Sequence, residues 1–205
     1  MRIVIVDSDA QYIKIIEKTV RSLQKENENR GNEHEKAVCL AGAAQDGKAG
    51  YELIREKGPD LVIMDLDLPE PGGIFLLRKL RHEKMDMHVL ILTEEADFGR
   101  ARQAIELGID NYMLKPVKTA QLKKAILQIG DKIENEKVLE KAFTIENIFT
   151  GCLSGQFRPD RNFHQMTREK YGFTLEEPGN VFTLWLGGNY MSQRKTARAI
   201  LENAV

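Results

Sequence analysis

Four polar side chains each stand directly after a short apolar segment of the chain: Asp7, Asp65, Thr93 and Lys115. A carboxylate can act as a nucleophile or hold a hard cation such as Mg²⁺, while an ammonium group and a hydroxyl can contact a phosphoryl oxygen. Each residue alone is a weak signal, because an aspartate after a strand is usually a helix cap or a turn residue. The four together indicate phosphoryl transfer to a carboxylate.

The apolar segments alternate with amphipathic segments over residues 1–130. Near-continuous apolar runs are typical of strands buried on both faces of a parallel sheet, and a helical period between them completes β–α units. We expect strands at Arg2–Val6, Ala37–Ala41, Leu61–Met64, His88–Leu92 and Asn111–Leu114. We expect helices at Tyr12–Leu23, Gly47–Glu56, Ile74–Leu80, Ala101–Leu107 and Leu122–Ile129. Five such units predict an α/β domain with a doubly wound, five-stranded parallel sheet.

The predicted sheet brings these polar residues to one edge. In open α/β sheets ligands bind outside the carboxyl ends of the strands. Asp7 and Asp65 end strands that we expect to be neighbours, and two converging carboxylates repel each other unless a cation lies between them. Mg²⁺ keeps several waters and uses one or two carboxylates together with a phosphate, so it suits this edge.

Longer motifs around these residues resemble the receiver domains of two-component response regulators. The motifs are Ile3-Val4-Ile5-Val6-Asp7, Leu61-Val62-Ile63-Met64-Asp65-Leu66-Asp67-Leu68-Pro69, Leu90-Ile91-Leu92-Thr93 and Tyr112-Met113-Leu114-Lys115-Pro116. Their order and spacing fit a receiver over roughly residues 1–130. The resemblance implies a flavodoxin-like sheet with strand order 2-1-3-4-5.

The resemblance also assigns roles to individual residues. Asp65 would accept a phosphoryl group from a sensor histidine kinase, and Lys115 would contact that group. Mg²⁺ would be held by Asp7, Asp65 and the backbone carbonyl of Asp67. The chain would then be a signalling switch, with no enzymatic activity beyond its own dephosphorylation.

Thr93 and Tyr112 would form the pair that reorients on phosphorylation. On its own, Tyr112 is only an aromatic residue in a predicted strand, where it more often belongs to the core.

One residue departs from the receiver pattern. Receivers usually carry two adjacent acidic residues after the first strand, but here the second position is Ser8. The loss of a negative charge should weaken Mg²⁺ binding. Asp9 is the other candidate ligand, although it lies one position further along and could instead cap the first helix.

The segment from Ala96 to Val117 closely resembles one kind of response regulator, the AraC-type (YesN-like) proteins. Such proteins place a long helix and a variable middle region after the receiver, followed by a helix-turn-helix domain. We therefore expect a receiver over 1–130, a helical linker over 131–150 and a partial, small α+β effector region over 151–205. The expected partners are the kinase and a second copy of the chain, with DNA contacted only through a domain that is missing before Val205.

A long helical pattern begins near Thr119, which we expect to be its N-cap. Leu122, Ile126, Ile129 and Ile133 follow a helical rhythm and should pack on the sheet. A second apolar set, beginning at Val138, extends past that core. It indicates either a short interhelical seam or a helix that covers the second region.

Composition excludes several other classes. The formal net charge is −1, and neither residues 1–130 nor residues 131–205 carry a basic surplus, which disfavours direct binding of nucleic acid. No run approaches the roughly 20 apolar residues of a membrane span, and the early Asp7 is unlike a secretory signal. Two cysteines imply no disulfide framework, which favours the cytosol, and Cys39 should pack in a buried strand.

An enzymatic alternative starts from Asp65-Leu66-Asp67. This pattern also opens the nucleophile motif of haloacid-dehalogenase-like, Mg²⁺-dependent phosphatases, in which Thr93 and Lys115 could fill the remaining roles. Three features disfavour it: the motif follows the third strand, Asp7 has no counterpart there, and no acidic pair follows Lys115. A dinucleotide-binding protein is disfavoured as well, because no Gly-x-Gly-x-x-Gly motif follows a strand.

Overall fold

The computed structural model describes residues 1–29, 38–142, 144, 147–148, 164–165 and 167–169. It divides into two compact units, Met1–Lys141 and Ala142–Val205. Most of the expected effector region over 151–205 lies outside the described residues; within it, residues 164–165 and 167–169 are helical. No helix among the described residues is both long enough and apolar enough to cross a membrane.

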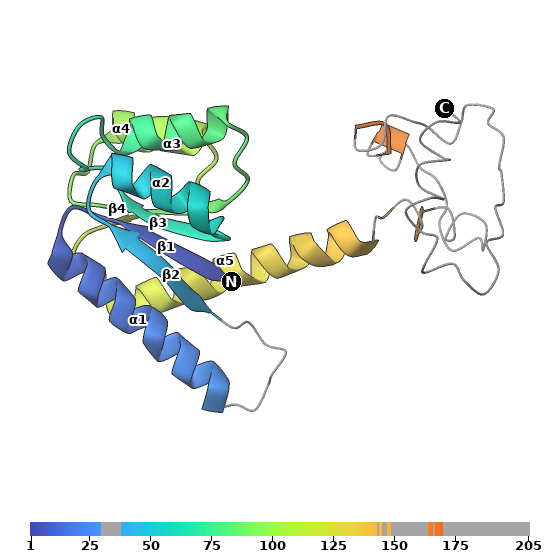
Figure 1. The fold of residues 1–205 in the computed structure, drawn as a ribbon, viewed down its shortest axis with the longest axis horizontal. Helices are drawn as coiled ribbons and strands as arrows, with labels where there is room; N and C mark the ends of the chain where they lie inside the picture. Colours follow the sequence, from blue (N-terminus) through green and yellow to red (C-terminus); the bar gives the residue numbers. More distant parts are fainter. Residues whose placement is uncertain (30–37, 143, 145–146, 149–163, 166, 170–205) are drawn as a thin grey trace. The chain divides into compact units, whose positions relative to one another are not determined.

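The first unit is a parallel five-stranded sheet with the order β2-β1-β3-β4-β5 (Figure 1). This confirms the predicted fold class and strand order. The strands are β1 (Arg2–Val6), β2 (Cys39–Ala44), β3 (Leu61–Asp65), β4 (His88–Thr93) and β5 (Asn111–Leu114). The helices are α1 (Ala10–Asn29), α2 (Gly47–Lys57), α3 (Gly73–His82), α4 (Phe98–Glu106) and α5 (Thr119–Ala142).

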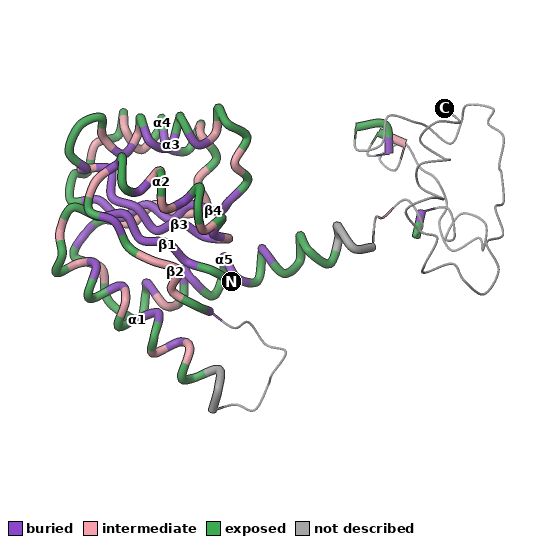
Figure 2. The backbone as a smooth tube through the Cα atoms, in the orientation of Figure 1, coloured by how far each residue is buried: buried purple, intermediate pink, exposed green. Residues whose placement is uncertain are grey.

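Two apolar clusters lie on the two faces of the sheet, which explains why β1, β3 and β4 read as continuous apolar runs. Ile3 and Ile5 of β1 point to one face, where they pack with α1 and α5. Val4 and Val6 point to the other face, where they pack with α2, α3 and α4. Figure 2 shows the resulting buried centre between two exposed layers.

The second strand differs from its prediction. It starts at Cys39 instead of Ala37 and continues to Ala44. The register with β1 slips between Ile3 and Val4, whose partners are Leu40 and Gly42, so the strand contains an irregularity that the apolar pattern does not reveal. Because β2 is an edge strand, Cys39 is exposed, and the prediction that it is buried is wrong.

Local caps set where the helices begin. Asp46 accepts a hydrogen bond from the Ala49 amide at the start of α2, and Asp97 accepts hydrogen bonds from two amides at the start of α4. The helix α5 begins at Thr119, and the Lys118 carbonyl accepts the first amide bonds. The expected N-cap at Thr119 is therefore one residue late.

The two apolar sets of α5 have different surroundings. Leu122, Ile126, Ile129 and Ile133 are all buried against the sheet, as predicted. Val138 is 57% exposed, and the helix runs on without a break through residue 130 to Ala142. The helix α1 likewise continues to Asn29, beyond its expected end at Leu23 and into a polar stretch.

Candidate functional site

Three charged side chains meet at the carboxyl edge of the sheet. Asp7 follows β1, Asp65 ends β3 and Lys115 follows β5. The Lys115 Nζ lies 2.8 Å from Asp7 Oδ2 and 2.8 Å from Asp65 Oδ2. Their side chains are only 1–4% exposed, so the structure brings together the two predicted carboxylates and the predicted cation in a buried cluster.

The two aspartates are held in the same way by their own backbones. Asp7 Oδ1 accepts a hydrogen bond from the Asp9 amide at 2.9 Å, and Asp65 Oδ1 accepts one from the Asp67 amide at 2.9 Å. Each carboxylate thus has one oxygen fixed by the residue two positions later and the other turned to Lys115.

The cluster holds one cation for two carboxylates. Burial raises the pKa of Asp7 above its ordinary value, although the Lys115 ammonium works against this. Burial lowers the pKa of Lys115, but its contacts with the Asp65 and Asp7 carboxylates outweigh this effect and leave the pKa raised. Lys115 therefore stays charged, and one negative charge in the cluster has no counterpart.

This excess charge fits a further cation. Asp7 Oδ2 is buried and, among the described residues, has no hydrogen bond of good geometry despite the nearby Lys115. Within the described residues, no group of three or more His, Cys, Asp or Glu side chains is arranged to hold a metal ion. A metal here would rest on two carboxylates and a backbone oxygen, which is the donor set expected for Mg²⁺.

Ser8 and Asp9, the two further candidate metal ligands, make different contacts. The Ser8 hydroxyl donates a long hydrogen bond of 3.4 Å to the Asp67 carbonyl, the backbone oxygen predicted to bind metal. Asp9 Oδ1 accepts a hydrogen bond from the Gln11 amide at 2.7 Å, at the start of α1. The carboxylate of Asp9 thus acts as a helix cap.

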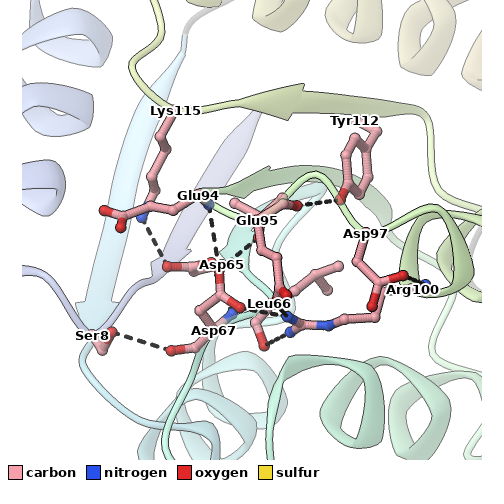
Figure 3. A network of polar contacts seen from close by, with 11 residues as sticks. Ser8, Asp65, Leu66, Asp67, Glu94, Glu95, Asp97, Arg100, Tyr112 and Lys115 are labelled. Atoms are coloured by element: carbon pink, nitrogen blue, oxygen red, sulfur yellow. Dashed lines mark hydrogen bonds and ion pairs between the residues drawn. The ribbon is translucent and has the colours of Figure 1, made fainter.

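The Thr93 hydroxyl, which is fully buried, donates to Asp67 Oδ2 at 2.7 Å. The Asp67 carboxylate also bonds to Arg100 of α4, whose Nη1 lies 2.5 Å from Asp67 Oδ1. Arg100 further donates to the Leu66 carbonyl at 2.6 Å and to Glu95 at 2.9 Å (Figure 3). Burial raises the pKa of Asp67, but the hydrogen bonds from Thr93 and Arg100 outweigh it and hold the pKa below its ordinary value.

Tyr112 lies beside the same loop, on β5. Its hydroxyl donates to the Glu95 carbonyl at 3.2 Å, and its side chain is partly buried. Thr93 and Tyr112 are therefore bonded to different partners around the β4–α4 loop. Figure 3 shows the contact between Tyr112 and Glu95.

Sequence reasoning missed three contributors: the side chain of Asp67, Arg100 and Tyr12. Lys115 Nζ lies 4.3 Å from the centre of the Tyr12 ring, a distance at which a cation is attracted to an aromatic face. Arg100 offered one signal, since a cation in the first turn of a helix opposes the helix dipole and needs a specific partner. The contact of Tyr12 carries no such local signal.

The family comparison agrees with this geometry. A family model described as "Response regulator receiver domain" matches residues 3–127. The chain belongs to that family. The match covers more than half of the chain, and it supports the receiver interpretation over the phosphatase alternative.

Several relatives are similar to this receiver. The probable C4-dicarboxylate response regulator DctR of Bacillus subtilis is 31% identical over 109 residues, which are 52% of this chain and 48% of that protein. The uncharacterized transcriptional regulatory protein YesN of the same organism is 29% identical over 104 residues, 51% of this chain and 28% of that protein. The chain thus spans half or less of the length of these relatives.

A solved structure shows the same fold. The REC domain of AraT, a response regulator from Geobacillus stearothermophilus, superposes with a TM-score of 0.56 at 25% identity. The similarity covers 66% of this chain and 97% of that domain.

Proposed function

We propose that the chain is the receiver part of a two-component transcriptional regulator and that Asp65 accepts a phosphoryl group from a sensor histidine kinase. The observation that carries this is the buried cluster of Asp7, Asp65 and Lys115 in a chain of the receiver family. Phosphorylation of an aspartate fits this family.

The transfer is a substitution at phosphorus. An oxygen of the Asp65 carboxylate forms a bond to phosphorus, and the bond from phosphorus to the histidine nitrogen of the kinase breaks. The electron pair of that bond leaves with the imidazole. Lys115, held charged by its two aspartates, stabilises the negative charge on the phosphoryl oxygens.

Mg²⁺ would be held by Asp7, Asp65 and the Asp67 carbonyl. When bound, it would neutralise charge on the transferring group. The hydroxyl of Ser8 contributes no negative charge, so we expect weaker Mg²⁺ binding than an acidic residue would give at that position. Asp7 Oδ2 is buried and accepts no hydrogen bond of good geometry from the described residues, which supports the assignment of Asp7 as a ligand.

The output follows from Thr93 and Tyr112. After transfer the Thr93 hydroxyl would turn to the phosphoryl group, Tyr112 would follow, and the surface around β4 and α5 would change shape. Dimerisation through that surface or through the extended α5 would pass the signal on. We assign the effector to the AraC (YesN-like) type, with residues 1–130 as receiver, 131–150 as helical linker and 151–205 as the start of a middle region, and DNA bound by a separate domain.

The test is incubation of the whole chain with acetyl phosphate and Mg²⁺, followed by intact mass measurement. We expect one phosphoryl group on the wild type and on Asp86→Asn, an exposed control aspartate between α3 and β4, and none on Asp65→Asn. No adduct on the wild type, or an undiminished adduct on Asp65→Asn, overturns the proposal. Multiple-turnover hydrolysis of a phosphomonoester would restore the phosphatase alternative.

A further inference from the structure

In this structure the Thr93 hydroxyl already donates to a partner other than the phosphoryl group of its proposed role. A threonine hydroxyl carries a single hydrogen. In this structure that hydrogen goes to Asp67 Oδ2 at 2.7 Å, and the acceptor is a charged carboxylate. The hydroxyl cannot donate to a phosphoryl oxygen on Asp65 while it donates to Asp67.

The carboxylate of Asp67 is itself fixed from the opposite side. Arg100 bonds to Asp67 Oδ1, while Oδ2 receives both the Thr93 hydroxyl and the Glu94 amide, the latter at 3.3 Å. The side chains of Arg100 and Asp67 are 26% and 32% exposed, so the ion pair is partly shielded from water.

Arg100 also connects the acceptor loop to α4. Its second nitrogen donates to the carbonyl of Leu66, the residue directly after Asp65. Arg100, in the first turn of α4, therefore bonds to both a backbone carbonyl and a carboxylate of the loop that follows Asp65 (Figure 3).

We propose that Asp67 and Arg100 are positioning residues for phosphoryl acceptance: Asp67, held by Arg100, retains the Thr93 hydroxyl until a phosphoryl group on Asp65 competes for it. The inference rests on the proposed function of Asp65. It makes the resting position of Thr93 and the position of α4 depend on the same carboxylate, so that the two change together.

Removal of the competitor should favour the phosphorylated form. In Asp67→Ala the Thr93 hydroxyl has no charged acceptor in the resting state. We expect the adduct formed with acetyl phosphate and saturating Mg²⁺ to be lost about ten-fold more slowly after removal of the donor, as the loss of one charge-assisted competing hydrogen bond implies.

Conservative variants separate positioning from structure. Asp67→Asn keeps an oxygen acceptor for Thr93 without the charge, so its adduct lifetime should fall between those of wild type and Asp67→Ala. Arg100→Met should lengthen the lifetime less than Asp67→Ala, and Arg100→Lys should return it toward wild type. Arg102→Ala, which removes an exposed pair with Glu106 on the same helix, is the matched control and should leave the lifetime unchanged.

The outcomes distinguish the two proposals. A wild type without adduct overturns the proposed function itself. A wild type that forms the adduct, with Asp67→Ala and Arg100→Met decaying at the wild-type rate, overturns only the positioning role. Thermal melting of each variant identifies a loss of fold, and an Asp67→Asn variant that melts like wild type but behaves like Asp67→Ala would show that the charge of Asp67 holds the hydroxyl.

Discussion

The two edges of the parallel sheet both carry aspartates paired with lysine, but they use the pairs differently. At the carboxyl edge, Asp7 and Asp65 share Lys115, and all three side chains are nearly inaccessible to water. At the amino edge, Asp110 and Asp60 pair with Lys132 and Lys137 of α5, whose side chains are more than half exposed.

The pKa directions express the same contrast. Burial raises the pKa of Asp7. Burial also acts to raise the pKa of Asp110, but hydrogen bonds from Lys132, His88 and the Val89 amide outweigh it and lower the pKa. Burial therefore disfavours the charge of Asp7 at the carboxyl edge, while the charged pairs at the amino edge join α5 to the sheet.

The largest effect should come from removing Lys115, the cation of the carboxyl edge. Lys115→Met leaves two buried carboxylates together and should lower the free energy of unfolding by about 3 kcal/mol in metal-free buffer. Lys132→Met breaks an exposed pair and should cost less than about 1 kcal/mol. Urea denaturation measures both, and equal losses would remove the distinction between the edges.

The two aspartates should respond with opposite signs. Asp110→Asn weakens the bonds to His88, Lys132 and the Val89 amide and should destabilise the protein by about 1–3 kcal/mol. Asp7→Asn removes a buried charge whose ionisation burial disfavours, so at neutral pH and without metal it should unfold at a higher urea concentration than wild type. A destabilised Asp7→Asn would contradict this account of the carboxyl edge.

The pH dependence of Asp110 gives a finer test. Its pKa in the folded protein is lower than the ordinary value of 3.8, so its contribution to stability is present above that value and is lost as the pH falls through the folded pKa. The difference in unfolding free energy between wild type and Asp110→Asn should therefore be full at pH 6 and shrink at pH 3. A difference that grows on acidification would have the wrong sign.

The smallest effect concerns Ser8. Ser8→Asp adds a carboxylate beside Asp7 and the Asp67 carbonyl, and it should tighten Mg²⁺ binding several-fold, as measured by calorimetric titration. Ser22→Asp on α1, away from this edge, serves as the control. Unchanged affinity in Ser8→Asp would show that position 8 does not contact the metal.

Much of the fold follows from local pattern, because strands buried on both faces must be apolar throughout. The expected bounds of β1 and β5 match the structure, and Asp7, Asp65 and Lys115 meet as the strand ends require. The predicted start of β2 is wrong because the residues of this strand are only weakly apolar. The register shift beside Gly42 also removes any clear alternation of apolar and polar residues.

The hydrogen bonds of Arg100, in contrast, could not be predicted from local sequence. Its partners Asp67 and Leu66 are more than thirty residues away in the chain, and the helix pattern of α4 says nothing about which loop its first turn faces. Such contacts depend on the tertiary arrangement of two loops, so the role of the Asp67 side chain could not be inferred from its place after the acceptor strand.

Gly73, the first residue of α3, stands against the acceptor loop with no side chain between them. A Cβ at this position would lie 2.5 Å from the Asp65 carbonyl oxygen and 2.7 Å from the Leu66 Cα, and the Gly73 amide donates to the Leu66 carbonyl. Backbone meets backbone here, and no flexible group is present to absorb a displacement. A displacement of the start of α3 would therefore be passed directly to the backbone of Asp65, the proposed phosphoryl acceptor.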